Sequence, residues 1–333
     1  MLKVGKLDSA LLEKLVFQSI RHKRTEVLKR PGIGEDCAVI DFGAYDCIVS
    51  TDPITAAVDQ IGRLAVHISC NDIAAEGVEP LGLLMAIMLP EGTTEAEIAT
   101  IMRQAGETAG LLGVEIIGGH TEITQAVRQP VVVSTAIGRA PARRDANTEK
   151  AAPGDLIYMT KSAGLEGSGI LAHDYEKALI GKLSSAEIQE AKSYLEQISV
   201  VKEGVAAGKT GVVAMHDVTE GGLLGAIWEL CYVAGTGAEI WQEAIPLSAV
   251  TEKICAAFDL DPLRLISSGC MVIVVRPEKK DALEKALAAA SVNATPIGMM
   301  REAADGLMLV SAGAAQAITP PESDELYKVV GRD

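Results

Sequence analysis

Segments with the pattern of β-strands alternate with segments with the pattern of helices along almost the whole chain. Residues 37–41 and 46–51 are typical of a strand hairpin, and we expect the second strand to end at Asp52-Pro53, where proline disfavours further pairing. Residues 60–76 carry apolar side chains at helical spacing. Such alternation is typical of helices packed on sheets, so the sequence predicts an α/β (α+β) fold. Further helices are expected at 9–20, 94–112, 171–180, 185–198, 223–233 and 279–290, and further strands at 82–89, 114–117, 131–137, 155–161, 211–215, 271–275, 295–299 and 307–310.

One polar stretch, residues 141–154, interrupts this alternation. It reads PARRDANTEKAAPG and is charged and bounded by prolines, which is typical of a linker. Domains usually span roughly 100–200 residues, so a chain of 333 residues has room for two. We therefore predict an N-terminal domain over 1–140 and a C-terminal domain over 154–320.

Charge and cysteine usage exclude several classes of protein. The formal net charge of −15 argues against nucleic acid or an anionic membrane as a partner, because both require a basic surface. The six cysteines form no C-x-x-C pair, and neither a signal-peptide core nor a bilayer-spanning apolar run is present. We expect a cytoplasmic protein with reduced thiols that acts on a small molecule.

Two glycine-rich segments resemble nucleotide motifs without matching them. Residues 204–210 (GVAAGKT) are one residue short of a P-loop and precede a strand, so Gly208 is interpreted as the end of a helix. Residues 164–169 (GLEGSG) lack the G-x-G-x-x-G spacing of a Rossmann turn, which disfavours a nicotinamide cofactor. That turn either offers backbone N–H groups to a phosphate or is a plain tight turn.

Acidic residues give a stronger indication of chemistry. Asp36 precedes a strand, Asp52 ends the next, and Asp72 shares a helical stripe with Ile61, Ala65 and Ile68 and should face inward. Each has an ordinary interpretation as a cap or turn residue, although a buried unpaired carboxylate is costly. Brought together, such groups favour a magnesium ion and a nucleotide triphosphate.

Two further motifs follow strands. Residues 118–122 (GGHTE) would let a polyphosphate approach the backbone at the glycines. Residues 217–222 (DVTEGG) open a helix for which Thr219 is a natural N-cap, and the N–H groups at this helix end would attract an anion. The alternative for the second motif is an ordinary capped helix with glycines for close packing.

Six motifs, taken in order, resemble those of the aminoimidazole ribonucleotide synthetase superfamily. This superfamily includes selenophosphate synthetase, thiamine-monophosphate kinase and the hydrogenase maturation factor HypE. The motifs span most of the chain, and the layout around 261–269 resembles the HypE branch most. The motifs are GEDCAVI (34–40), STDPI (50–54), NDIAAEGVEPLG (71–82), GGHTE (118–122), PGDLIYMTKSAGLEGSG (153–169) and DVTEGGLLGAIWE (217–229).

The resemblance implies a two-domain PurM-like fold in which N-terminal domains of a homodimer form a shared β-barrel and ATP occupies the cleft between the halves. ATP and Mg²⁺ are the implied cofactors, and the implied chemistry is activation of a substrate oxygen by phosphorylation. It assigns magnesium to Asp36, Asp52, Asp72 and Asp217, nucleotide contacts to Asn71, Gly118, Gly119, His120 and Thr121, and the second-domain lining to Gly164, Gly167 and Gly169.

The HypE resemblance also implies hydrogenase or cofactor maturation and a maturation protein as partner. Two features depart from it. HypE proteins end in a cysteine that carries the carbamoyl group, whereas this chain ends VVGRD, so that route is not expected here. His120 stands where HypE proteins carry an acidic residue, and Lys6 is either a mobile catalytic lysine or an ordinary surface residue. The alternatives are a small-molecule kinase or amidine-forming ligase, and a non-catalytic, nucleotide-binding dimeric scaffold.

Overall fold

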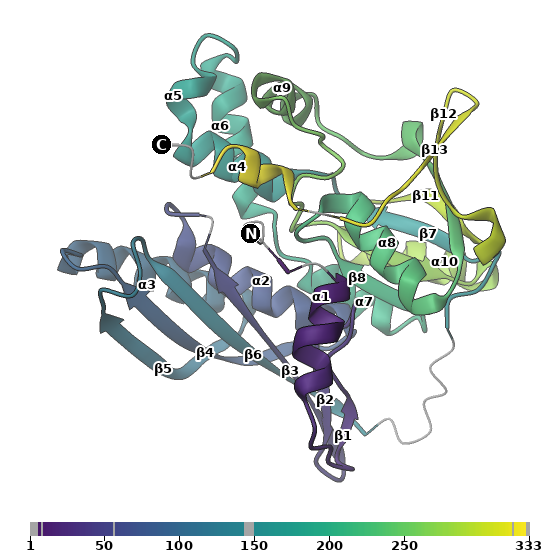
Figure 1. Cartoon of the computed structure of the whole chain (residues 1–333), viewed down its shortest axis with the longest axis horizontal. Helices are drawn as coiled ribbons and strands as arrows, with labels where there is room; N and C mark the ends of the chain where they lie inside the picture. Colours follow the sequence, from purple (N-terminus) through teal and green to yellow (C-terminus); the bar gives the residue numbers. More distant parts are fainter. Residues whose placement is uncertain (1–5, 8, 56, 143–149, 322, 331–333) are drawn as a thin grey trace.

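The computed structural model describes residues 6–7, 9–55, 57–142, 150–321 and 323–330. It contains two β-sheets with helices packed on them, one sheet on each side of the predicted linker (Figure 1). The predicted α/β fold is therefore confirmed. Residues 143–149 of the predicted linker lie outside the described residues, and the exact domain limits stay a prediction.

The first sheet has six strands in the order β1-β2-β3-β6-β4-β5. Neighbouring strands are antiparallel except β4 and β5, which run parallel and are connected by helix α3, Glu95–Leu112. This leaves β5 as an edge strand far from β2 and β3 (Figure 1). The strands are β1 Val27–Lys29, β2 Ala38–Asp41, β3 Tyr45–Ile54, β4 Pro80–Leu89, β5 Glu115–Ile123 and β6 Val131–Pro141.

Strand β3 does not end at Asp52-Pro53 as predicted. It continues to Ile54, and Pro53 pairs with Val133 of β6. Pairing with β2 stops at Val49, so β3 has an open edge on that side at Pro53. A proline is tolerated at such an edge because no ladder hydrogen bond depends on its missing N–H.

Helix α2, Ile61–Ala75, is buried on all sides. We predicted a single inward stripe ending in Asp72, but every residue of the helix except Arg63 is buried. One side packs on the first sheet, and the other packs on elements of the second half, so residues of both halves belong to one hydrophobic core. A helix that is covered all round is typical of the centre of a large protein.

The second sheet has seven strands in the order β13-β12-β9-β11-β7-β10-β8, antiparallel except for β12 and β9. The sequence missed β9, β13 and α9, and of α7 it predicted only the end at Gly208. The strands are β7 Leu156–Thr160, β8 Ala214–Asp217, β9 Gly237–Trp241, β10 Met271–Val275, β11 Ala294–Arg301, β12 Leu307–Ser311 and β13 Ala314–Ala317, and the helices are α4 Leu165–Asp174, α5 Glu176–Leu179, α6 Ser185–Ser193, α7 Val201–Gly208, α8 Gly222–Ala234, α9 Ala249–Phe258 and α10 Lys280–Ala289.

The P-loop-like glycines are packing residues. They lie on and at the end of α7, where a Cβ atom on Gly204 would come within 2.2 Å of the Ala74 carbonyl oxygen. A Cβ atom on Gly208 would come within 2.7 Å of the Gly77 Cα. The helix does end at Gly208, as predicted, and the glycines allow α7 to approach α2 closely.

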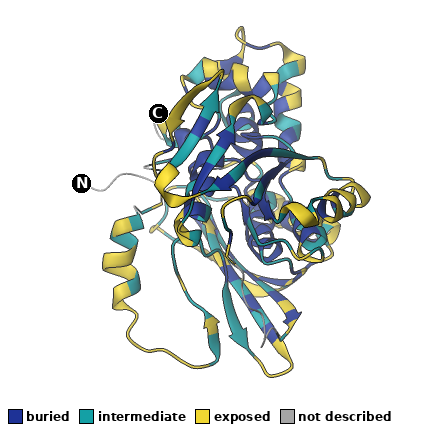
Figure 2. Cartoon of the chain, turned by 90° about the vertical axis from the view of Figure 1, so that its right-hand side faces the viewer, coloured by how far each residue is buried: buried dark blue, intermediate teal, exposed yellow. Residues whose placement is uncertain are grey.

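The N-terminal helical segment is irregular and exposed. The predicted helix over 9–20 begins as α1, Ser9–Leu11, and continues as a π-helical and a 3₁₀ turn, none of which has a buried residue (Figure 2). In the described part of the chain, no helix combines the length and the apolar character needed to span a membrane.

We predict that Gly204→Ala will lower the free energy of unfolding by about 1–3 kcal/mol, because the new methyl group must displace the backbone of α2. The measurement is urea unfolding followed by circular dichroism. Gly106→Ala in the exposed face of α3 is the control, since nothing lies within 4 Å of its Cβ position. It should stabilise the protein slightly; equal effects of the two changes would contradict the packing argument.

Candidate functional site

Four aspartates from both halves of the chain meet in one place. Asp36 precedes β2, Asp52 lies within β3, Asp72 lies in α2, and Asp217 ends β8. The side-chain oxygens of Asp36 and Asp217 lie within 4.8 Å of each other and of a ring nitrogen of His216. Asp72 is under the electrostatic influence of the other three. The structure thus brings together all four aspartates to which the resemblance assigns magnesium.

Asp72 faces inward, as its helical position predicts. Its side chain accepts a hydrogen bond from the Ser50 hydroxyl on the neighbouring strand β3. Burial, followed by the negative charges of Asp217 and Asp52, raises the pKa of Asp72 well above its usual range. Without a cation, this carboxyl group therefore favours its protonated form.

Both carboxylate oxygens of Asp217 are available to bind a metal ion. Asp217 is fully buried, and neither carboxylate oxygen has a hydrogen-bond partner among the described residues. Burial raises the pKa of Asp217 as well. His216, whose Nδ1 lies 3.9 Å from Asp217 Oδ1, offsets only part of this burial, and a buried carboxylate without a hydrogen-bond partner favours a further cation. Because the neighbouring ligands are also carboxylate oxygens, the set fits a hard cation such as Mg²⁺.

The sequence interpretation missed the cation that faces these carboxylates. Nε2 of the buried His216 donates a hydrogen bond to Glu229 Oε2 at 2.8 Å, and Nδ1 lies 3.2 Å from Asp36 Oδ2. Burial alone would lower the pKa of His216, but Asp36, Asp217 and Glu229 together raise it well above its usual value. The sequence did contain an indication of this role, because His216 directly precedes Asp217 and Glu229 is the last residue of the motif DVTEGGLLGAIWE (217–229).

Lys6 approaches the same network from the N-terminal segment. Its backbone N–H donates to Glu220 Oε2 at 3.0 Å, and its Nζ lies 3.4 Å from Glu229 Oε1. The Lys6 side chain remains 55% exposed. A pairing with Glu229 thus connects this lysine to the carboxylate cluster through His216.

Asn71 joins the two halves. Its amide nitrogen donates to the Ile198 carbonyl at 2.8 Å, and its amide oxygen accepts from the Val200 N–H at 2.8 Å. The side chain is completely buried. The nucleotide contact predicted for Asn71 would require these hydrogen bonds to be exchanged, so in this structure Asn71 is an interdomain link.

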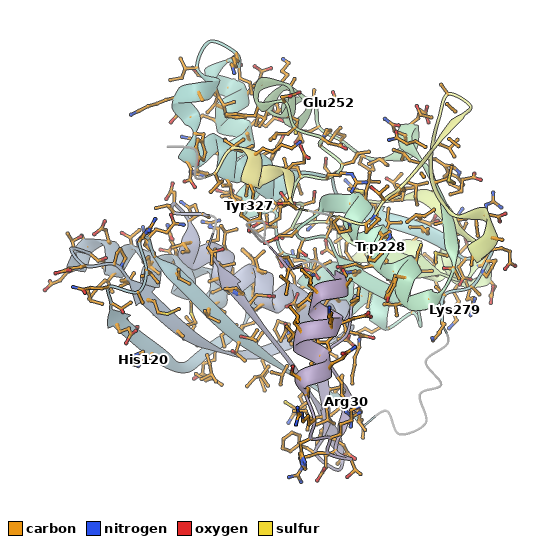
Figure 3. All side chains as sticks on the ribbon, viewed as in Figure 1. Arg30, His120, Trp228, Glu252, Lys279 and Tyr327 are labelled. Carbon is orange, nitrogen blue, oxygen red and sulfur yellow. The ribbon has the colours of Figure 1, made fainter. Side chains whose placement is uncertain are left out.

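The GGHTE motif lies apart from the carboxylates of the same chain. Strand β5 does not end before the glycines, as predicted, but runs through them. Gly119 pairs with Met85, which pairs with Ser134, which pairs with Asp52. Gly119 is therefore three strand spacings, about 14 Å, from Asp52. Gly118, Gly119, His120 and Thr121 are all exposed on this edge strand, and Figure 3 shows His120 far from Trp228 and Tyr327.

The glycines of the 164–169 turn belong to a buried helix. Gly164 is the N-cap of α4, and the helix begins at Leu165. A Cβ atom on Gly167 would come within 2.4 Å of Leu265, and one on Gly169 within 2.5 Å of Leu195. The missing side chains make room for neighbouring leucines, and the predicted role of these glycines in lining the nucleotide stays a prediction.

The N-cap of helix α8 is not the predicted residue. Thr219 is not its N-cap; Gly221 is, with a φ of 88° that favours glycine. The Gly221 N–H donates to Asp324 Oδ2 at 2.7 Å, so a carboxylate from the C-terminal segment satisfies the helix end.

A small pocket with a cavity volume of about 50 Å³, open to solvent, lies between the two halves beside the cluster. Pro53, adjacent to Asp52, and Glu220, three residues after Asp217, both line it. Glu166 from the first turn of α4 also lines it and is only 4% exposed. The sequence singled out the glycines around Glu166 but not Glu166 itself.

Two protein-family models match the chain. The N-terminal domain of AIR synthase related proteins matches residues 34–140, and the C-terminal domain of the same proteins matches residues 152–309. A carbamoyl dehydratase HypE from Bradyrhizobium diazoefficiens is 31% identical, over 82% of this chain and 77% of its own length. The chain belongs to the AIR synthase superfamily, in its HypE branch. It is thus a member of a superfamily of enzymes, as predicted.

Other relatives cover nearly the full length. A putative hydrogenase expression/formation protein of Methanocaldococcus jannaschii is 27% identical, over 98% of this chain and 97% of its own. A chain in the crystal structure of a HypE–HypF complex matches with a TM-score of 0.75 at 22% identity, covering 94% of this chain and all of that one. A HypE in complex with ATP matches with a TM-score of 0.67 at 20% identity, covering 98% of both. The predicted PurM-like two-domain fold is confirmed, while the shared barrel stays a prediction.

We predict that Glu166→Gln will stabilise the protein at pH 8 and change little at pH 5. Burial raises the pKa of Glu166 to about 7 from an ordinary 4.5, so the folded state retains a proton that the unfolded state has lost. Stability from this group is present below pH 4.5 and is lost as the pH rises to 7. The wild type should lose roughly 2–3 kcal/mol of unfolding free energy between pH 5 and pH 8 that the variant retains. Urea unfolding at both pH values tests this; parallel pH profiles would contradict it.

Proposed function

We propose that this protein is an ATP- and magnesium-dependent enzyme that activates an oxygen of a small carboxamide, carbonyl or phosphate-accepting substrate by phosphorylation, within hydrogenase or cofactor maturation. The convergence of Asp36, Asp52, Asp72 and Asp217 carries this proposal. These residues come from both halves, and Asp217 has two buried oxygens that no described protein group satisfies. A metal–nucleotide complex bound between the halves would satisfy them.

The four aspartates would hold the ion, and magnesium bound there would neutralise charge on the phosphates of ATP. The protein's own residues position this set. Ser50 holds the carboxyl group of Asp72, and Glu229 holds the ring of His216 against Asp36. Lys6 stands at the outer end of this chain of contacts, beside Glu229. Its exposed amine would lie near the entrance to the site.

A scaffold without turnover is the weaker alternative. Such a protein would bind the nucleotide at the same buried carboxylates without turning it over, so the cluster alone does not distinguish a scaffold from an enzyme. Relatives support the enzymatic reading, since one is named as a carbamoyl dehydratase and one structure is of a HypE in complex with ATP. The HypE–HypF complex supports a maturation protein as a partner.

A homodimer is part of the proposal because the outer face of the first sheet is apolar and uncovered. Leu81 is 59% exposed and Leu84 41% exposed on β4, and Ile117 is 51% exposed on β5. The half-buried Val133 and Ile137 of β6 alternate with core residues and so belong to the same outer face. Contiguous apolar surface of this kind is typical of a protein interface. A second sheet packed against it would complete the barrel that the resemblance implies.

The dimer would also give the GGHTE motif a role. Gly118–Thr121 are exposed on an edge strand whose outer side pairs with no described strand, and they lie too far from the aspartates of their own chain to share a metal-bound phosphate. A second copy could present its own motif to this cluster. This arrangement reconciles the predicted nucleotide contacts with the distances within one chain.

We predict that Asp72→Asn will weaken magnesium-dependent ATP binding at least tenfold while leaving the protein folded. The change removes one anionic ligand of the metal-bound state, whereas Asp72 favours its neutral form without a cation, so the free energy of unfolding should not fall in parallel. Calorimetric titration with ATP, with and without Mg²⁺, measures the loss. Asp259→Asn is the matched control, because Asp259 is exposed at a left-handed φ of 57° that asparagine tolerates. Equal losses of binding and stability would reject Asp72 as a ligand.

Turnover is tested on the same samples by release of ADP and phosphate. Wild-type protein with Mg–ATP should show slow release that Asp217→Asn abolishes. Tight binding with no release in the presence of carboxamide and carbonyl compounds would favour the scaffold alternative.

We predict that Leu84→Glu will weaken self-association at least tenfold, because two copies of the charge would be buried at a twofold interface. Sedimentation velocity over a range of concentrations measures the equilibrium. Leu111→Glu on α3, where the side chain is already 82% exposed, should leave it unchanged. A wild type that sediments as a monomer would reject the dimer.

A further inference from the structure

The pocket between the halves has a wall of acidic side chains set in apolar surroundings. Its apolar lining comes from Ile54 of β3, Ile170 of α4, and Ile266 and Leu326 of the second half. Its polar lining consists of Thr55, Glu166, Glu220, Asp324 and Tyr327. No lysine, arginine or histidine is among the described residues that line it. Figure 3 shows Tyr327 on the short turn that lies between the two halves.

Two of the three carboxylates already have partners. Asp324 accepts hydrogen bonds from the backbone N–H groups of Gly221, Ile266 and Leu326 at 2.7–3.2 Å. Glu220 accepts from the Tyr327 hydroxyl at 2.9 Å and from the Lys6 backbone N–H at 3.0 Å. These two residues therefore hold the C-terminal and N-terminal segments in place.

Glu166 differs from both. Its side chain is 96% buried by area, since only 4% is exposed, and Oε2 has no hydrogen-bond partner among the described residues. Burial raises the pKa of Glu166, and hydrogen bonds with Ser268 only partly offset this rise. The negative charges of Asp324 and Glu220 raise the pKa further. A buried carboxylate oxygen that lines an open pocket and lacks a donor is an unfilled position for a ligand.

The chemistry of this wall selects the ligand. Burial raises the pKa values of Glu166 and Asp324 to about 7, and Glu220 is near the Lys6 amine. Yet none of the described residues lining the pocket is basic, so the ionised forms of these acidic groups repel phosphate, carboxylate and thiolate groups. They attract a group that is positively charged and rich in N–H donors, and an amidinium or guanidinium plane matches a carboxylate with two parallel hydrogen bonds. The Tyr327 hydroxyl donates to Glu220 and is also hydrogen-bonded to the Thr55 side chain, so it is already paired, and Glu166 Oε2 is the acceptor of this wall that has no partner among the described residues.

We propose that this pocket binds the cationic, N–H-rich end of a small substrate, an ammonium, amidinium or guanidinium group, with Glu166 as its principal acceptor. This inference rests on the proposed function in one respect: Pro53 and Glu220 place the pocket beside Asp52 and Asp217, so a substrate held here would extend its oxygen toward the metal-bound nucleotide.

Binding should also move a proton. Burial raises the pKa of Glu166 to about 7, with Asp324 and Glu220 contributing in the same direction. A cation beside Oε2 favours the ionised form, so the carboxyl group releases its proton to solvent when the ligand binds. A purely structural glutamate would show no such ligand-linked release.

The experiment is calorimetric titration of the full chain with acetamidine and with agmatine at pH 6.5, in phosphate and in ACES buffer, without nucleotide. We expect saturable binding whose heat differs between the buffers, and no binding of acetate or methyl phosphate. Glu166→Gln should weaken acetamidine binding at least tenfold and remove the buffer dependence. Glu252→Gln, the same change on the exposed face of α9, should leave both unchanged.

Glu166→Met, similar in length and without an acceptor, is the second variant if the glutamine variant does not fold. Absence of saturable binding of either cation to folded wild type, or binding that neither Glu166 variant weakens, would overturn the proposal. ATP titration of the same samples separates the two ideas. Cation binding without ATP binding would support the ligand proposed for the pocket and reject the proposed function. ATP binding without cation binding would reject only the ligand proposed for the pocket.

Discussion

The packing of α2 between the two sheets is the constraint on which the rest of the structure depends. Its residues contribute to the core of the first half, while Ala74 and Ala75 belong to a cluster with Tyr158 and Met271 of the second half. The close approach of α7 is possible only because Gly204 has no side chain. The two halves are therefore held in one relative position by a shared interior, and any site built between them inherits that rigidity.

This rigidity explains how a cluster of like charges persists. The aspartates come from a loop, two strands and a helix, and mutual repulsion alone would separate them. The hydrogen bonds of Asn71 to Ile198 and Val200 hold α2 against the second half, and His216 supplies an opposing charge held by Glu229. The interior thus holds these carboxylates close together despite their repulsion, which a bound cation would reduce.

Much of the fold follows from patterns within single segments. The helical period of 61–75, the capping box at Thr94 and the apolar run 271–275 each determine their element locally. The inward position of Asp72 follows from the same period. The features that the sequence did not predict depend on contacts between residues far apart in the chain. Pro53 continues a strand because β2 ends early, and α8 starts at Gly222 because Asp324 satisfies its end. The isolation of Gly119 from Asp52 follows from strand order, which no local pattern contains.

The C-terminal segment forms one wall of the pocket without belonging to either sheet. Its 3₁₀ turn, Glu325–Lys328, is attached through Asp324 to the backbone at Gly221 and Ile266, and these contacts require no particular side chain at those two positions. Leu326 anchors the turn in the hydrophobic core, whereas Tyr327 is half-buried and Lys328 is exposed, so these two positions can change during evolution while both sheets and the aspartate cluster stay the same. Related enzymes can diverge in the molecules they accept by exchange at Tyr327, which lines the pocket, and this makes the position a natural place to redesign selectivity.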